Sequence, residues 1–140
     1  MITRASLLKL LIQTSHLPNI RHPLMLSGIA NVLLIDPVDV LDMHNLISRS
    51  YLIMTDSGGL QEEAPHFGKP VLVLRTETER PEAVEAGTVK VVGTGEDAIY
   101  SEARILLEDR SAYEAMAKAV NPYGDGHASE RIVEVIRNIK

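Results

Sequence analysis

The feature that most constrains the fold is a short apolar run, a glycine turn, a helical segment and a second apolar run within residues 52–82. The first run covers residues 52–54, and a Ser-Gly-Gly turn at residues 57–59 leads into an acidic helical segment. The second run covers residues 71–74. This succession predicts two strands of a parallel sheet joined by a crossover helix.

The same alternation continues along the rest of the chain. Apolar runs predict further strands at residues 32–35 and 88–92, and at residues 7–14, where a helix is the alternative. Helices are expected over residues 23–30, 36–49, 94–107, 110–120 and 127–138. Strands that alternate with helices predict an α/β fold, a Rossmann-like doubly wound parallel sheet, and we expect one domain over residues 1–140.

Particular residues predict where some of these elements begin and end. Asp36 as N-cap and Pro37 at the first helical position predict a helix start. Pro65 removes a hydrogen bond from the helix after the glycine turn, so we expect that helix to be short or kinked and to end near Gly68. The continuous branched run at residues 32–35 is typical of a strand covered on both faces.

Composition argues against several classes of function. The net charge of −5 disfavours a nucleic-acid-binding protein, which normally carries a basic patch. The chain has no cysteine, and its five histidines are scattered without metal-ligand spacing, so we expect no metal and no cofactor. No apolar run approaches the ~18 residues of a membrane span. Lys9 and Gln13 interrupt the apolar start that a signal peptide would need, so we expect a cytoplasmic protein without a membrane partner.

The glycine turn is the strongest candidate for a ligand site. Ligands of an open α/β sheet bind beyond the carboxyl ends of its strands. Ser57, Gly58 and Gly59 follow such an end, where glycines let a ligand approach the backbone and a helix N-terminus attracts an anion. We expect the turn to bind a diphosphate. The alternative is an ordinary strand-to-helix turn with Ser57 as the N-cap.

Charged residues on either side of this turn are the other candidates. Glu62 and Glu63 are adjacent on a helix and point about 100° apart, so at most one faces the ligand. A carboxylate there can accept hydrogen bonds from ribose hydroxyls. Arg75 and Arg80 follow the second strand, where an arginine can bind an anion through two hydrogen bonds. We choose Glu63 and Arg80 as ligand contacts; the alternatives are acids that stabilise a helix start and a solvated charged loop.

Together these pieces resemble the non-hydrolysing UDP-N-acetylglucosamine 2-epimerases. The resemblance covers nearly the whole chain from His16 onward, whereas residues 1–14 match the family poorly. It is carried by LLIDPVDVL (33–41), LIMTDSGGLQEEAPHFGKPVLVLRTETERPEAVEAGTVKVVGT (52–94) and NPYGDGHASERI (121–132).

The resemblance implies a two-domain architecture of the GT-B glycosyltransferase type, to which this chain contributes the C-terminal half. It implies inversion at C2 of UDP-GlcNAc to give UDP-ManNAc, a precursor of cell-surface polysaccharides, by elimination of UDP to a glycal and re-addition. It also implies that Ser57, Gly58 and Gly59 bind the diphosphate, that Glu63 binds the ribose, and that Arg80 contacts the UDP.

The sequence departs from the family pattern in two ways. Met43 stands where the family usually has an aromatic residue against the nucleotide. The family's catalytic acids lie in an N-terminal domain that has no counterpart here, so we expect no catalytic residue in this chain. The chain alone is expected to bind UDP weakly and not to epimerise.

The resemblance leaves the partners and two other functions open. The small-molecule partner is UDP or UDP-GlcNAc. The protein partner is either a second copy in a homodimer or an N-terminal catalytic half supplied separately. One alternative function is a non-catalytic UDP-sugar-binding module, and the other is the nucleotide domain of a GT-B glycosyltransferase. The TERPEA and QEEA segments favour the epimerase.

Overall fold

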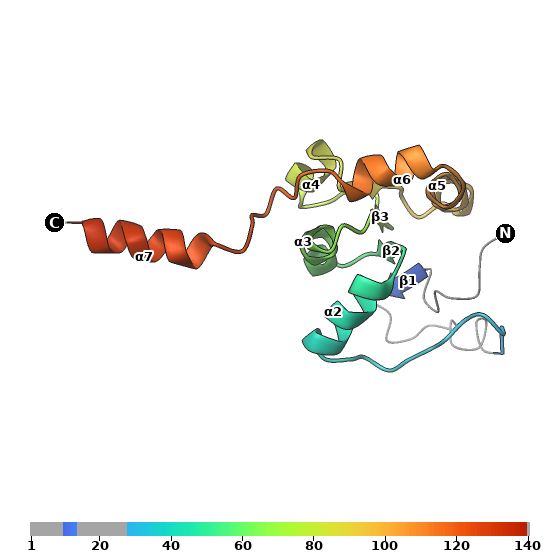
Figure 1. The fold of residues 1–140 in the computed structure, drawn as a ribbon. Coiled ribbons are helices and arrows are strands. Elements are labelled where there is room, and N and C mark those ends of the chain that lie inside the picture. The colour runs from blue at the N-terminus through green and yellow to red at the C-terminus, as the bar shows by residue number, and fades with distance from the viewer. Residues whose placement is uncertain (1–9, 14–27, 140) are drawn as a thin grey trace.

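The computed structural model describes residues 10–13 and 28–139, and within them four parallel strands form one sheet. The strand order β1-β2-β3-β4 follows the sequence, and β1, β2 and β3 lie in that order in Figure 1. Because each pair of neighbours is parallel, the carboxyl ends lie at the same edge of the sheet. The strands are β1 (Leu10–Gln13), β2 (Leu52–Thr55), β3 (Val71–Val73) and β4 (Val89–Val91). In this register Leu10 pairs with Leu52, and Val71 pairs with both Ile53 and Val89.

Helices cover both faces of the sheet. The helices in the described part of the chain are α2 (Val40–Arg49), α3 (Gly58–His66), α4 (Pro81–Glu85), α5 (Glu96–Glu108), α6 (Arg110–Ala117) and α7 (Ala128–Asn138), of which all but α7 lie against the sheet. The connections α3 and α4, with α2 before them, cover one face, and α5 and α6 cover the other. This arrangement confirms the predicted Rossmann-like doubly wound α/β fold.

The core follows from the two-residue period of the strands. Successive side chains of a strand point to opposite faces. Ile53 packs in one apolar cluster with Ile47 of α2, whereas Leu52 packs in a second cluster with Leu106 of α5. Every residue of β2 and β3 is buried. Each large apolar side chain buried in this way contributes about 1.5–3 kcal/mol.

The ends of α3 agree with the sequence prediction. The helix has nine residues, contains Pro65 in its last turn and has Phe67 as its C-cap. Gly68 follows with a left-handed φ of 63°, a conformation that glycine adopts without strain. The N–H groups of Gly68 and Lys69 donate to the carbonyls of Pro65 and Ala64 at 3.0 and 3.3 Å. A short helix that ends near Gly68 is therefore confirmed.

The predicted start of α2 is wrong. Asp39, rather than Asp36, is the N-cap, and its side chain accepts a hydrogen bond from the N–H of Asp42 at 2.9 Å. Both aspartates have the capping chemistry, so the sequence allows a start at either, and the path of the chain turns into the helix at Asp39.

The predicted strand at residues 32–35 is also wrong. Residues 32–39 form neither strand nor helix, and the exposed fractions of Val32 to Ile35 lie between 38% and 77%. An apolar run becomes a strand only where a neighbouring strand takes its backbone hydrogen bonds. None of the four strands in the described part of the chain pairs with it.

The other predictions have mixed outcomes. The strand expected at 7–14 appears as β1, with residues 7–9 and 14 outside the described residues. Of the helix expected at 23–30, residues 23–27 lie outside them, and residues 28–30 form turns rather than helix. The strand expected at 88–92 is confirmed as β4, and the three last helices are confirmed as α5, α6 and α7.

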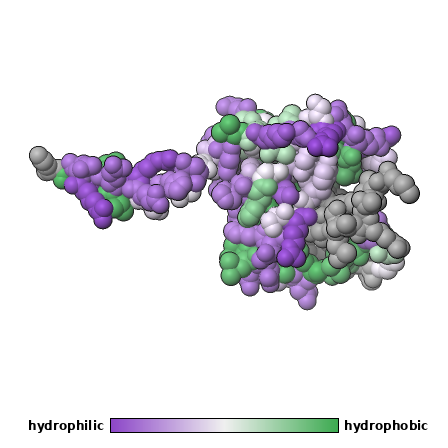
Figure 2. Space-filling view, viewed as in Figure 1, coloured by the Kyte–Doolittle hydropathy of each residue, from purple (hydrophilic) through white to green (hydrophobic). Residues whose placement is uncertain are grey.

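Helix α7 lies apart from the sheet and its covering helices (Figure 1). Its branched side chains are exposed, and apolar and polar surface alternate along it (Figure 2). Arg131 in its first turn forms an ion pair with Asp125, which joins the helix to the preceding turn. Across the residues that the structure describes, no helix is both long and apolar enough to span a membrane.

Candidate functional site

The Ser-Gly-Gly turn begins α3 directly beyond the carboxyl end of β2. Ser57 is the N-cap in an extended conformation, but its hydroxyl makes no capping hydrogen bond. The backbone N–H of Ser57 donates to the Oγ1 of Thr55 at 2.9 Å. The turn therefore directs the N-terminus of α3, the positive end of the helix dipole, toward the strand edge where ligands of α/β sheets bind.

The two glycines in this turn are not required by the backbone or by packing. Neither Gly58 nor Gly59 has a left-handed φ. A Cβ at Gly58 would meet no atom within 4 Å, and one at Gly59 would lie 3.5 Å from Oε1 of Glu63. Glycine in a helix costs about 1 kcal/mol relative to alanine. What glycine provides here is an open approach to the backbone at the helix start.

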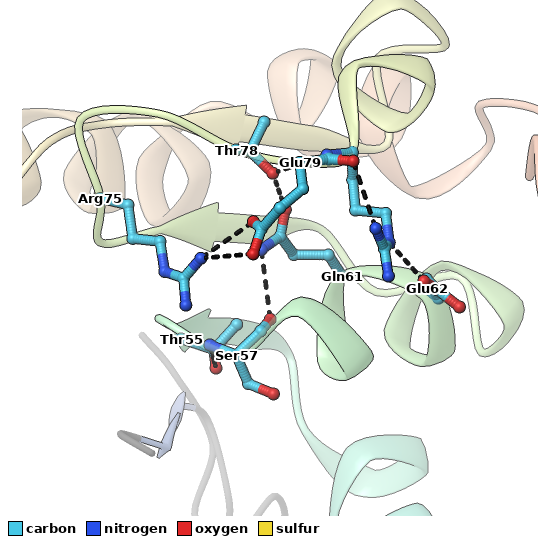
Figure 3. A network of polar contacts seen from close by, with 8 residues as sticks. Thr55, Ser57, Gln61, Glu62, Arg75, Thr78 and Glu79 are labelled. Carbon is cyan, nitrogen blue, oxygen red and sulfur yellow. Dashed lines mark hydrogen bonds and ion pairs between the residues drawn. The ribbon is translucent and has the colours of Figure 1, made fainter. Parts of the chain in front are cut away.

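A buried glutamine joins this turn to the loop after β3 (Figure 3). Gln61 is fully buried, and its Nε2 donates to the carbonyl of Ser57 at 3.2 Å. Its Oε1 accepts from Oγ1 of Thr78 at 2.5 Å, and the same Oγ1 accepts from the N–H of Arg80 at 3.1 Å. These bonds, which we call the Gln61 clasp, hold the backbone of Arg80 at a set place relative to the turn.

Sequence reasoning missed the clasp because its partners are 17 residues apart. The signal was a glutamine inside the acidic helical segment, at a position that turns out to face the core. A buried polar side chain needs hydrogen-bond partners, so such a glutamine marks a fixed contact.

Arg80 is the N-cap of α4, and its guanidinium contacts the protein on one side. Its Nε donates to Oε1 of Glu62, and its Nη1 donates to the carbonyl of Glu79 at 3.2 Å. The Glu62 carboxylate raises the pKa of Arg80 above its ordinary value through this hydrogen bond and its charge. Nη2 makes no hydrogen bond within the described residues, so its N–H groups are left for a ligand.

Arg75, the other arginine of this loop, pairs with a single carboxylate through one nitrogen. Its Nη1 contacts both carboxylate oxygens of Glu79 at 3.0 and 2.9 Å. The hydrogen bonds with Arg75 and with its own backbone lower the pKa of the Glu79 carboxyl, the backbone bond contributing most. Arg75 is therefore engaged with its neighbour on the same loop, and the choice of Arg80 as the candidate contact stays a prediction.

The two adjacent glutamates of α3 point to different partners. Glu62 pairs with Arg80, whereas Oε2 of Glu63 lies 3.1 Å from Nε2 of His44 on α2. Oε1 of Glu63 is the atom that faces Gly59. The Glu63 carboxylate thus lies beside the glycine turn, whereas the Glu62 carboxylate points toward Arg80.

Met43 is on α2, immediately before His44. It is partly buried and packs against the apolar cluster that contains Leu60 and Ala64 of α3. Because α2 contacts α3, Met43 lies close to α3, the helix that begins at the glycine turn. Sequence reasoning did not anticipate the contact of His44, since nothing in its local sequence distinguishes it from a histidine on a helix surface.

Tyr123, from the turn segment before α7, also reaches this region. Its ring packs against the same apolar cluster as Met43. Burial raises the pKa of Tyr123, and the negative charges of Glu82 and Glu62 raise it further.

No group of three His, Asp or Glu side chains in residues 10–13 and 28–139 is arranged to hold a metal ion.

Comparisons with known proteins agree on one family. A family model described as UDP-N-acetylglucosamine 2-epimerase matches residues 2–137. A UDP-N-acetylglucosamine 2-epimerase of Escherichia coli K12 is 54% identical over 123 residues, which are 86% of this chain and 33% of that protein. One of Bacillus subtilis is 61% identical over 101 residues, 72% of this chain and 27% of that protein. The chain spans about a third of the length of these curated relatives.

Solved structures give the same result. The UDP-GlcNAc 2-epimerase of Neisseria meningitidis bound to UDP-GlcNAc has a TM-score of 0.81 and 51% identity, over 91% of this chain and 36% of that one. The S. aureus MnaA co-structure with UDP has a TM-score of 0.83 and 42% identity, over 93% of this chain and 46% of that one.

Proposed function

The chain belongs to the UDP-N-acetylglucosamine 2-epimerase family, and we propose that it is the UDP-binding portion of an enzyme that inverts C2 of UDP-GlcNAc to give UDP-ManNAc. The observation that carries this proposal is the start of α3. An N-terminal helix turn with two glycines that neither φ nor packing requires lies beyond the end of β2. Such a turn suits a diphosphate, because the phosphate oxygens can come close to the backbone N–H groups.

Each neighbouring residue then has a role in binding UDP. Ser57, Gly58 and Gly59 bind the diphosphate, with the Ser57 hydroxyl as an additional donor. Glu63, whose Oε1 faces Gly59, accepts from the ribose hydroxyls. Arg80 donates to UDP from Nη2, the guanidinium nitrogen that Glu62 and Glu79 leave without a partner. Met43 lies on the nucleoside side and contacts the base.

These contacts match what the proposed reaction needs. The proton on C2 goes to a base, its C–H electrons form the C1–C2 double bond, and the C1–O bond breaks with its electron pair moving to the UDP oxygen. Donors already oriented toward that oxygen stabilise the charge that develops. UDP must stay bound until it adds back to C1, because release of UDP at this stage would leave free glycal. Tight contacts to ribose and diphosphate serve this purpose.

The groups that move the C2 proton belong to the part of the enzyme that this chain does not span. General acid–base groups must come within hydrogen-bond reach of the reacting atoms, and we assign none of the described residues to that task. We therefore expect the 140-residue chain to bind UDP weakly and not to epimerise. The test is to incubate UDP-GlcNAc with the chain alone and then to separate the two epimers. Formation of UDP-ManNAc would contradict this expectation.

The diphosphate site is tested by replacing Gly58. In Gly58→Ala the methyl group meets no protein atom within 4 Å and improves helix propensity, so stability should rise by up to about 1 kcal/mol. The same methyl group stands where the diphosphate approaches, so UDP affinity should fall about tenfold or more in calorimetric titration. Gly95→Ala, at the start of α5 and also in open space, is the control and should leave affinity unchanged. Unchanged UDP affinity in Gly58→Ala, or no UDP binding by the wild type, would refute the proposed site.

A further inference from the structure

His44 is in contact with the proposed ribose-binding residue from a different helix. Its Nε2 lies 3.1 Å from Oε2 of Glu63, and both side chains are a little over one-third exposed. The other oxygen of the same carboxylate, Oε1, faces Gly59. A single carboxylate therefore has one oxygen held by α2 and the other directed at the glycine turn.

The imidazole is itself held in place. The ring of His44 lies 5.6 Å from the ring of Phe67, centroid to centroid, at an angle of 51°. A carboxylate can only accept hydrogen bonds, so the ring nitrogen facing it carries the proton. That nitrogen donates in the neutral ring with the proton on Nε2 and also in the imidazolium, so the contact holds Oε2 in both states.

We propose that His44 is a positioning residue that gives the site its preference for ribose over 2′-deoxyribose, an inference that rests on the proposed function. A glutamate on a half-exposed helix surface samples several rotamers, and binding must select one of them. With Oε2 held by His44, Oε1 is already directed toward the ligand and accepts from the ribose hydroxyls. A hydroxyl-binding group held in advance rejects the analogue that lacks the hydroxyl.

The test compares UDP with 2′-deoxy-UDP by calorimetric titration of the full chain. The wild type should bind UDP at least about tenfold more tightly than 2′-deoxy-UDP. His44→Leu keeps an apolar contact for Phe67 but loses the donor, so the preference should fall at least about threefold through weaker UDP binding. His44→Gln places an amide N–H at similar reach and should keep most of the preference. His66→Leu, which also removes a ring beside Phe67 but does not contact Glu63, should leave the preference unchanged.

Thermal unfolding of each variant separates positioning from folding. If His44→Leu does not fold, His44→Asn is the second variant, because its amide is too short for the contact and should show the same loss. A full ribose preference in a folded His44 variant without the donor would overturn the inference, and so would an equal loss of affinity for both nucleotides. UDP binding by the wild type without any ribose preference would overturn it while leaving the diphosphate site intact. No UDP binding by the wild type would refute both the inference and the proposed function.

Discussion

Replacing Gln61 by leucine should weaken the fold and the candidate site together. Leucine has a similar size and suits a fully buried position, but it removes the hydrogen bonds to the Ser57 carbonyl and to the Thr78 hydroxyl. Two net hydrogen bonds of ~1 kcal/mol each amount to about 2 kcal/mol of lost stability. Ser57 and Thr78 are partly exposed, so water can reach the groups left behind and the loss should not greatly exceed this value.

The expected result can be measured by thermal unfolding. A loss of 2 kcal/mol should lower the unfolding midpoint by about 8 °C, since ~1 kcal/mol corresponds to ~4 °C in a domain of this size. UDP affinity should fall as well, because the clasp sets the distance between the turn and Arg80.

A double-mutant cycle tests the physical reason for this loss. Thr78→Val removes the other partner of the 2.5 Å bond, so the double variant Gln61→Leu/Thr78→Val should be more stable than the sum of the single losses predicts, by about 1 kcal/mol. Thr76→Val, at an exposed position of the same loop, is the control and should show no coupling with Gln61→Leu. Additive losses for Gln61 and Thr78, within about 0.3 kcal/mol, would refute the clasp.

Three further predictions concern stability. Gly68→Ala should lower the free energy of unfolding in urea by about 1–2 kcal/mol, because φ is +63° and the added Cβ would lie 3.3 Å from a backbone oxygen. Gly95→Ala has neither feature and is the control, so equal stability of the two variants would contradict the reasoning. Hydrogen bonds from Lys118 and Arg110 lower the pKa of the Glu114 carboxyl from 4.5 to about 2. The extra stability of the wild type over Glu114→Gln should therefore be complete above pH 4.5 and be lost as the pH falls through 2. A stability difference that does not change with pH would be inconsistent with that pKa. Tyr113→Phe should cost about 1 kcal/mol in the same urea assay, because it removes the 3.0 Å bond to the Tyr51 carbonyl but keeps the stacked rings, and Tyr100→Phe on the exposed face of α5 should cost less.

Much of the fold could be predicted because its causes are local. The apolar runs that became β2, β3 and β4 have branched residues between turn signals, which favours strands in almost any α/β context. The end of α3 depends on Pro65 and on the left-handed φ at Gly68, both of which are properties of single residues. The Ser-Gly-Gly turn was singled out for the same reason.

The failures share one physical cause. Residues 32–35 have the composition of a buried strand, yet a strand requires a neighbour that takes its hydrogen bonds. Asp36 and Asp39 both have capping chemistry, and only the three-dimensional path of the chain selects Asp39.

For the candidate site, the sequence by itself determined which residues we propose as UDP contacts, because a glycine turn after a strand, a carboxylate one turn later and an arginine beyond the next strand are readable in order. The tertiary structure decided how those residues are held. The Gln61–Thr78 bond of the clasp, the pairing of Arg80 with Glu62 and the contact of His44 with Glu63 each join residues 17 to 19 positions apart. Such contacts depend on the packing of α2, α3 and the loop after β3 against one sheet, and no local pattern specifies that packing.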